Sequence, residues 1–280
     1  PPHGLKCGLQ RVRERVKKFS AMTSLNLPAM LLAAGRGERM RPLTDTTPKP
    51  LLQVQGRALL DWHMAALLRD GVRDVVVNTA WLGAQIPAHL DDIWPTQGMQ
   101  LQYSHEQHDF GHALETAGGI ARALPLLGEA FWLAAGDVFA PDFVFDAQLA
   151  QRFAQSDDLA HIWLVPNPAH NLKGDFGFAP DAPDSHTGRA IHLPPGDVAR
   201  DARPRLTYST IALLKADLFR PPFCGMAAGN PDGVAEPLAP LLRRAMDAGR
   251  CAASLYTGRW TDVGTPERLA ALNQSATQNS

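Results

Sequence analysis

The stretch Met30-Leu-Leu-Ala-Ala-Gly-Arg-Gly-Glu-Arg-Met-Arg-Pro-Leu-Thr, followed by Thr47-Pro48-Lys49-Pro50-Leu51-Leu52, decides the fold class of this chain. It begins as an apolar run typical of a buried strand and opens into a loop that contains two glycines. Glycines let the backbone approach phosphate oxygens closely and turn N–H groups toward them, and nearby basic residues supply positive charge. The glycines are Gly35 and Gly37, and the basic residues are Arg36, Arg39, Arg41 and Lys49. The stretch therefore predicts a strand followed by a loop that binds a polyphosphate.

Two common glycine-rich phosphate motifs do not fit this loop. The dinucleotide-binding pattern Gly-x-Gly-x-x-Gly needs a third glycine, and Met40 occupies that position. The P-loop pattern needs Gly-Lys-Ser/Thr at a fixed spacing after its first glycine, and no such triplet follows Gly35. A Rossmann oxidoreductase and a P-loop NTPase are both disfavoured.

The rest of the chain alternates short apolar runs with segments of helical periodicity, which indicates parallel strands joined by crossover helices. We expect an α/β fold with a Rossmann-like mixed, mainly parallel sheet flanked by helices. Strands are expected at 29–34, 74–78, 100–103, 130–135, 161–165, 206–214 and 251–256, with helices at 59–69, 82–90, 118–124, 237–248 and 265–273. Residues 166–204 are rich in Pro, Gly, Asp and His and predict a loop-rich β excursion.

Length and composition favour one domain. The chain has 280 residues, of which 45% are hydrophobic, enough for one substantial core. We expect a catalytic domain at 28–280 after a basic, disordered extension at 1–27, with Met22 as an alternative start. The extension could form a short amphipathic helix, but it lacks the apolar stretch of a signal peptide.

Charge and cysteine content limit the partners that we expect. The chain has a net charge of −1, and its first 20 residues are strongly basic, so the remainder is acidic and unsuited to binding nucleic acid. No stretch is long and apolar enough to predict a membrane span. Cys7, Cys224 and Cys251 form no Cys-x-x-Cys pair, which fits a reducing cytoplasm. We expect a cytoplasmic monomer whose partners are small-molecule substrates.

The quoted stretch resembles the signature of the sugar-1-phosphate nucleotidyltransferases, Gly-x-Gly-x-Arg-Met/Leu-x-Pro-Leu-Thr followed by Pro-Lys-Pro. The resemblance continues in the same order through Val75-Val-Val-Asn78, Leu114-Glu-Thr-Ala-Gly-Gly119, Gly136-Asp137 and Gly258-Arg-Trp-Thr-Asp262-Val-Gly-Thr. It implies the nucleotide-diphospho-sugar transferase fold. The hexapeptide repeats of the C-terminal β-helix found in larger members have no counterpart here.

The resemblance implies a reaction in which a sugar-1-phosphate oxygen attacks the α-phosphorus of a nucleoside triphosphate and pyrophosphate leaves. Arg39, Lys49 and Asp137 match the catalytic residues, with Arg39 gripping the triphosphate and Lys49 contacting oxygens around the α-phosphorus. Asp137 and Asp262 correspond to the family's metal-binding aspartates, which implies a Mg²⁺ cofactor.

Further site residues follow from the same resemblance. The nucleotide-binding residues are expected to be Ala33, Ala34, Gly35, Gly37, Asn78 and Gly118, although Asn78 could instead be a simple strand-end turn residue. Gly174, Asp175 and Ser209 are expected to bind the sugar. The usual Glu-Lys-Pro sugar-contact motif is missing, and Tyr208-Ser209-Thr210 stands where a glycine-containing stretch is more usual. Glucose and mannose are therefore doubtful substrates.

A combination of four motifs resembles the short bacterial N-acetylmuramate-1-phosphate uridylyltransferases of peptidoglycan recycling, which join UTP to N-acetylmuramate α-1-phosphate. The motifs are Asn78-Thr-Ala-Trp81-Leu-Gly, Leu114-Glu-Thr-Ala-Gly-Gly119, Lys173-Gly-Asp-Phe and Gly258-Arg-Trp-Thr-Asp262-Val-Gly-Thr-Pro-Glu-Arg268. Mannose-1-phosphate guanylyltransferase and glucose-1-phosphate thymidylyl- or uridylyltransferase activities remain alternatives. A non-catalytic regulator that binds a nucleotide sugar is disfavoured because the phosphate and metal residues are all present. Extra residues near 107–112 depart from the compact pattern, and we expect the histidine-rich segment 105–112 to be a mobile loop over the nucleotide rather than a metal cluster.

Overall fold

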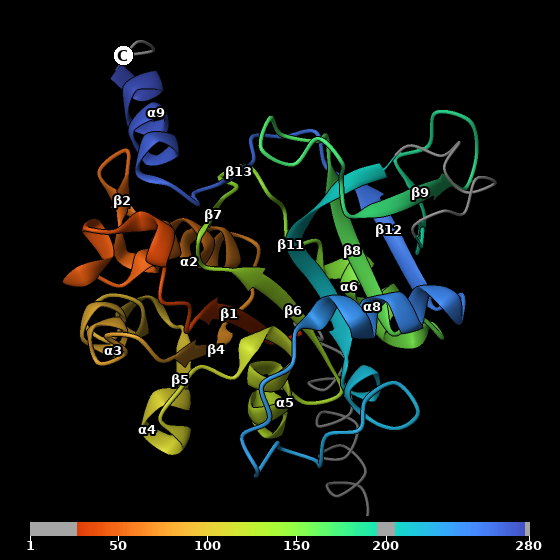
Figure 1. Cartoon of the computed structure of the whole chain (residues 1–280), viewed down its shortest axis with the longest axis horizontal. Helices are drawn as coiled ribbons and strands as arrows, with labels where there is room; N and C mark the ends of the chain where they lie inside the picture. The colour runs from red at the N-terminus through yellow and green to blue at the C-terminus, as the bar shows by residue number, and fades with distance from the viewer. Residues whose placement is uncertain (1–26, 195–204, 278–280) are drawn as a thin grey trace, which may run out of the picture.

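A nine-stranded sheet forms the centre of the computed structural model, which describes residues 27–194 and 205–277 (Figure 1). The strand order is β5-β4-β1-β6-β11-β8-β12-β10-β9. Seven strands run in one direction, and β10 and β11 run in the other. The strands are β1 (Ala29–Ala33), β4 (Asp74–Thr79), β5 (Gln100–His105), β6 (Ala130–Ala135), β8 (Ala160–Val165), β9 (Phe176–Pro180), β10 (Thr187–Ile191), β11 (Arg205–Lys215) and β12 (Cys251–Leu255).

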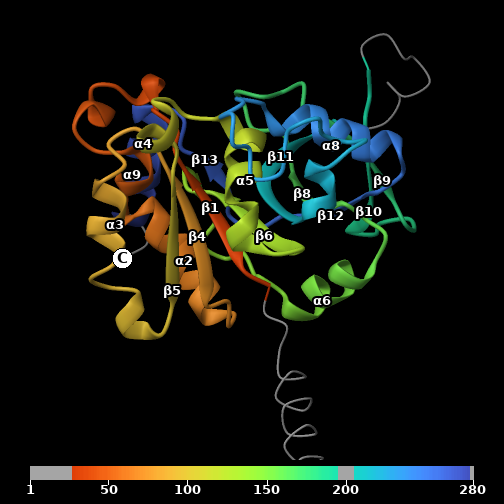
Figure 2. The same ribbon diagram turned by 90° about the horizontal axis from the view of Figure 1, so that it is seen from below.

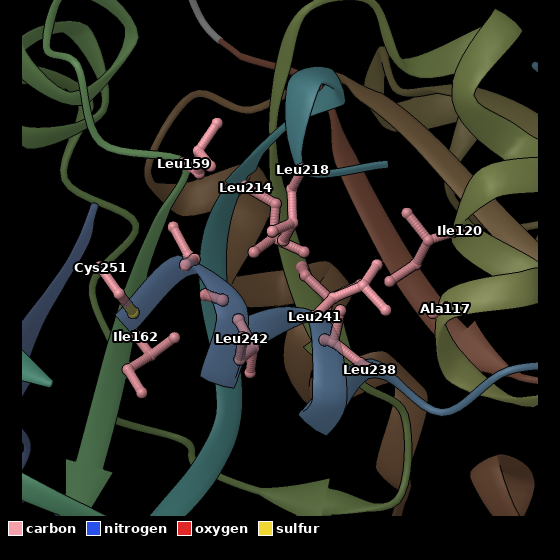
Figure 3. Packing of buried hydrophobic residues seen from close by; sticks show 14 of the residues in the cluster. Ala117, Ile120, Leu159, Ile162, Leu214, Leu218, Leu238, Leu241, Leu242 and Cys251 are labelled. Carbon is pink, nitrogen blue, oxygen red and sulfur yellow. The ribbon is translucent and has the colours of Figure 1, made fainter. Parts of the chain in front are cut away.

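Helices cover both faces of the sheet because its central strands are apolar on both sides. Met30 of β1 belongs to the core beneath α5 (Glu115–Leu127) and α8 (Leu238–Asp247). Its neighbour Leu31 belongs to the opposite core, which contains residues of α2 (Leu59–Arg69), α3 (Gln85–Leu90) and α6 (Ala147–Gln155). Figure 2 shows α8 and α6 on opposite sides of β8 and β12. Figure 3 shows the first core, which contains Ile120 of α5, Leu241 of α8 and Leu214 of β11.

A third, smaller core joins the two ends of the described chain. It lies among short elements: β2 (Gln53–Val54), β3 (Arg57–Ala58), β7 (Val138–Phe139), β13 (Thr261–Asp262) and α9 (Pro266–Thr277). Met40 of the glycine loop packs there with Phe139, Val263 and Leu269, all of them buried. Figure 1 shows β7 and β13 between α9 and the strands of the main sheet. The C-terminal helix therefore supports the loop that follows β1.

The expected fold class, a mixed and mainly parallel sheet flanked by helices, is confirmed. The loop-rich excursion contains the antiparallel pair β9 and β10. The basic extension at 1–27 and Met22 lie almost entirely outside the described residues. Within the described part of the chain, no helix is long and apolar enough to cross a membrane. Cys224 and Cys251 are both buried and free.

Two segments differ from the sequence-based expectation. Residues Glu106–Phe110 form helix α4 within the segment expected to be a mobile loop, because Glu106 is buried and its carboxylate accepts a hydrogen bond from the Leu114 N–H. Helix α6 was not expected; Asp146 caps it by accepting hydrogen bonds from Gln148 and Leu149 N–H groups. In the described residues, the histidines of 105–112 belong to no group of three or more metal-binding side chains.

Candidate active site

Lys49 and Asp137 form the central ion pair of the site. Asp137 follows β6, and Lys49 begins a short 3-10 helix, Lys49–Leu51, between two prolines that restrict the backbone. Lys49 Nζ lies 2.5 Å from Asp137 Oδ2. The lysine side chain is only 9% exposed, whereas the aspartate side chain is 37% exposed. The pair therefore fixes a nearly buried ammonium group beside a carboxylate that a ligand can reach.

Strand pairing brings Asp262 next to Asp137. β13 pairs with β7 in antiparallel fashion, with Asp262 opposite Val138, and the Val263 N–H donates to the Asp137 carbonyl at 3.1 Å. The two predicted metal-binding aspartates, 125 positions apart, are thus neighbours: Asp262 ends β13 and Asp137 immediately precedes β7. Sequence order alone could not show this proximity.

The donor set at this position suits a hard divalent cation. Such ions bind one or two carboxylates and complete their coordination with phosphate oxygens and water. Asp137 and Asp262 supply two partly exposed carboxylates, which fits this requirement. The described residues contain no cluster of three or more acidic, histidine or cysteine ligands, so a protein-only cage is absent there.

The glycine loop lies directly over Lys49. Gly37 has φ +66°, and a Cβ atom there would lie 3.1 Å from Lys49 Cβ and from Thr44 Cγ2. Thr44 Oγ1 donates to the Gly37 carbonyl at 2.8 Å and fixes the turn. A Cβ atom at Gly35 would meet nothing within 4 Å, and Gly35 is exposed. Gly37 is thus required for packing and backbone conformation, whereas Gly35 presents open backbone.

Arg39 lies near β13, the strand that carries Asp262, and has no ion-pair partner in the part of the chain that the structure describes. It is exposed. A Cβ atom at Gly264 would lie 3.3 Å from Arg39 Nη2 and 3.1 Å from Asp262 Oδ1. Arg36 instead stacks over the Trp81 ring at 4.6 Å. Among the loop arginines, Arg39 is placed to meet a polyphosphate beside the carboxylates.

Asn78 forms a buried hydrogen-bond network at the ends of β1 and β4. Its Oδ1 accepts from the Ala33 N–H at 2.8 Å, and its Nδ2 donates to Glu106 Oε1 at 2.7 Å. Both Asn78 and Glu106 are buried, and burial raises the pKa of the Glu106 carboxyl. Ala34, which follows Ala33, is also largely buried. The structure thus gives Asn78 a structural role; nucleotide binding by Asn78 remains a prediction.

Gly118 lies under a segment that the sequence did not connect with it. A Cβ atom at Gly118 would collide with the Val234 carbonyl oxygen. The Asn230 amide donates to the Gly118 carbonyl at 3.1 Å, and the Gly118 N–H donates to the Glu236 carbonyl at 3.1 Å. Because Gly118 has no side chain, the backbone of segment 230–236 can pack directly against α5. Base recognition by Gly118 stays a prediction.

The predicted sugar-binding residues meet around a bulge in β11. Asp175 Oδ2 accepts from the Tyr208 N–H at 2.8 Å, and the Ser209 carbonyl accepts from Trp260 Nε1 at 3.1 Å. The β11–β8 register shifts between Tyr208 and Ala212, and Thr210 has φ +62°, a rare conformation for a β-branched residue. Gly174 also has a positive φ, of +62°. Asp175 is therefore bound to the strand one residue before Ser209, whereas the Ser209 side chain is buried and its Oγ accepts from the Ile211 N–H at 3.2 Å. Sugar binding by these residues stays a prediction.

His63 is a site residue that sequence reasoning missed. It lies on α2 and is buried, and its Nε2 donates to the Val138 carbonyl at 2.8 Å, next to Asp137. Burial lowers the pKa of His63, so the ring is neutral at neutral pH. A lone histidine on an apolar helix gives no signal by itself. Its contact with the backbone next to Asp137 becomes visible only in the folded structure, where β7 packs against α2.

Comparisons with known proteins identify the family of this chain. The family model described as nucleotidyl transferase matches residues 28–191. The chain is 43% identical, over 87% of its length and 95% of the relative, to an N-acetylmuramate alpha-1-phosphate uridylyltransferase of Neisseria meningitidis serogroup B. It is 31% identical to the protein of that name from Caulobacter vibrioides, over 87% and 94% of the two chains. A solved UDP-glucose pyrophosphorylase complexed with UDP-glucose has a similar fold, with a TM-score of 0.68 and 15% identity over 91% of this chain and 100% of that one.

Proposed function

Because this chain belongs to the nucleotidyl transferase family, we propose that it condenses UTP with N-acetylmuramate α-1-phosphate to give UDP-N-acetylmuramate and pyrophosphate. The choice of substrates is supported by the similarity to the two uridylyltransferases named above. The observation that carries the activity is the Lys49–Asp137 ion pair beside Asp262, under a glycine loop that also holds Arg39.

Electrostatic positioning is the main contribution that this chain makes to the reaction. Both substrates are anions, so bringing an acceptor phosphate to the α-phosphorus requires fixed positive charge. Lys49, held by Asp137, supplies an ammonium group with little freedom to move. Arg39, which pairs with no carboxylate among the described residues, would pair with the triphosphate and with the pyrophosphate as its negative charge develops. No general base is needed, since the attacking phosphate oxygen is already ionised.

A divalent cation, which we propose to be Mg²⁺, would be held by Asp137 and Asp262 and would neutralise phosphate charge. The partly exposed carboxylates leave room for phosphate oxygens to share the ion. The neutral His63 holds the Val138 carbonyl and so restrains the backbone that carries Asp137.

We propose that Gly35, Ala33 and Ala34 form the floor beneath the nucleotide, with Gly118 at its edge. The sugar would lie toward Gly174, Asp175 and Ser209, near the β11 bulge, where Asp175 accepts from the Tyr208 N–H. The product is a cell-wall sugar nucleotide, so we infer a role in peptidoglycan recycling in the cytoplasm.

The test is pyrophosphate release by the purified protein with Mg²⁺. UTP, dTTP and GTP are each combined with N-acetylmuramate-1-phosphate, N-acetylglucosamine-1-phosphate, glucose-1-phosphate and mannose-1-phosphate. Selective turnover of UTP with the muramate sugar is the expected result. Preference for another pair would keep the chemistry and change the substrate. Absence of turnover with every pair would contradict enzymatic activity.

A further inference from the structure

Arg268, on α9, uses only part of its hydrogen-bonding capacity within the protein. Its Nη1 donates to Asp262 Oδ2 at 2.8 Å, to the Asp262 carbonyl at 3.0 Å and to His170 Nε2 at 3.2 Å. Its Nε and Nη2 have no partner among the residues that the structure describes. The side chain is 20% exposed. One edge of the guanidinium group is therefore held in place while the other is available.

Arg268 stands beside another arginine at the candidate active site. A Cβ atom at Gly264 would lie 2.9 Å from Arg268 Nη1 and 3.3 Å from Arg39 Nη2, so both guanidinium groups border the same small residue. Asp262 is the carboxylate between them. Two like charges next to one carboxylate leave excess positive charge, which a bound anion would neutralise.

The position of Arg268 favours the acceptor sugar over the nucleotide. His170, which contacts Arg268, belongs to the segment that leads to Asp175. Asn171 Nδ2 donates to Asp175 Oδ1 at 3.2 Å, and this contact ties the segment to the β11 bulge. Arg39 and Lys49 come instead from the segment that follows β1. Arg268 is thus the arginine that borders both the carboxylates and the sugar-side segment.

We propose that Arg268 binds an oxyanion of the acceptor sugar with its Nε and Nη2 edge. The oxyanion is either the phosphate at C1 or the carboxylate of the muramate lactyl group, since both present two oxygens to a guanidinium fork. This inference rests on the proposed function. Asp262 orients the guanidinium through Nη1, so that binding requires little reordering of the side chain.

The experiment compares Arg268→Gln and Arg268→Lys with the unmodified protein. Pyrophosphate release is measured in two series: N-acetylmuramate-1-phosphate is varied at saturating UTP to give the acceptor KM, and UTP is varied to give the UTP KM. Calorimetry gives the binding constants of N-acetylmuramate-1-phosphate and N-acetylglucosamine-1-phosphate. For Arg268→Gln we expect the acceptor KM to rise about tenfold or more, as for loss of charge-assisted hydrogen bonds, with little change in the UTP KM. Arg268→Lys should recover part of the loss, because it keeps charge without the fork.

Arg259→Gln is the matched control. Arg259 also lies near β13, but its Nε and Nη2 are both bound to Asp142, at 2.6 and 2.7 Å, on an exposed surface. Its acceptor KM should stay unchanged. Melting temperatures show whether each variant folds. If Arg268→Gln does not fold, the acceptor KM of Arg268→Lys is compared with that of the unmodified protein instead.

Each outcome decides the inference. Equal weakening of both sugar phosphates identifies the phosphate as the ligand, and weakening of the muramate sugar alone identifies the carboxylate; either supports the inference. An unchanged acceptor KM, or equal increases for acceptor and UTP, would overturn it, because Arg268 would then only hold Asp262. If the unmodified protein turns over no sugar phosphate, the proposed function itself fails, and this inference fails with it.

Discussion

The parallel half of the sheet (β5, β4, β1 and β6) and the half formed by β11, β8, β12, β10 and β9 present their candidate site residues in different ways. In the parallel half these residues follow strand ends within short motifs, as Gly35 follows β1 and Asp137 follows β6. In the other half they depend on contacts between distant segments. Asp175 binds the β11 backbone, and the Ser209 carbonyl accepts from Trp260.

This difference shows that each half of the sheet positions its site residues by a different structural means. Parallel strands direct their carboxyl ends to one edge, so that short loops at that edge converge with little further support. An irregular antiparallel strand such as β11 can instead reposition a side chain by a bulge. We therefore expect changes in the parallel half to alter turnover or stability strongly, and changes in the other half to have smaller effects.

The largest effect should come from Asp137→Asn. We expect turnover to fall by about 10²–10³-fold, because the site loses a carboxylate that a divalent cation needs and that neutralises Lys49. UTP should still bind, since Arg39 and the glycine loop are unchanged. Pyrophosphate release measures the first effect and calorimetric titration with UTP the second.

Asp142→Asn is the control for Asp137→Asn, because Asp142 pairs only with the exposed Arg259 among the ion pairs of the described chain. It should retain nearly full turnover. Near-normal activity of Asp137→Asn with a divalent cation present would contradict the metal assignment. It would also contradict the expectation that changes in the parallel half reduce turnover most strongly.

The motifs of the parallel half could be interpreted from sequence because each combines a strand end with residues suited to its chemistry. The positive charge of Lys49 was predicted from the loop itself, and the role of Asp137 from the family resemblance, whereas their 2.5 Å contact depends on the sheet order. The partners of Asn78 and Gly118 could not be predicted, since they come from Glu106 and Val234 through long-range packing. Arg268 was part of a matched motif, but its neighbours depend on where α9 packs.

The next largest effect should be on stability, in Asn78→Ala. We expect the free energy of unfolding to fall by about 2–3 kcal/mol, because the Ala33 N–H and the buried Glu106 carboxyl each lose a hydrogen-bond partner. Urea unfolding at pH 7 measures this change. The UTP KM of the folded variant then decides whether Asn78 also contacts the nucleotide: an unchanged KM would leave it a structural residue.

Asn167→Ala provides the comparison in the other half. Asn167 donates to the Arg205 carbonyl at 2.9 Å and accepts from Thr207 Oγ1 at 2.9 Å, but it is only partly buried. Water can replace these partners, so the loss should be about 1 kcal/mol. If Asn167→Ala lost as much unfolding free energy as Asn78→Ala, the two halves of the sheet would not differ in their sensitivity to such changes.

The last expected effect appears only when the pH is lowered, and it concerns His161 of β8. Burial lowers the pKa of His161 to about 4, and its Nε2 contacts Ser254 Oγ at 2.8 Å. The unfolded chain, with a histidine pKa of about 6.5, binds a proton between pH 6.5 and 4 that the folded protein does not bind. The free energy of unfolding therefore falls as the pH is lowered, and His161 contributes about 2 kcal/mol of this loss by pH 5.

His161→Gln keeps a polar group near Ser254 and removes the titration. Urea unfolding at pH 7 and pH 5 should show a difference in stability about 2 kcal/mol smaller than in the unmodified protein. The remaining acid sensitivity should include His63 in the parallel half, whose pKa burial also lowers. An unchanged pH dependence would mean that His161 is protonated as readily in the folded protein as in the unfolded chain. The acid sensitivity would then lie with His63 and the rest of the chain, and β8 would not contribute to it.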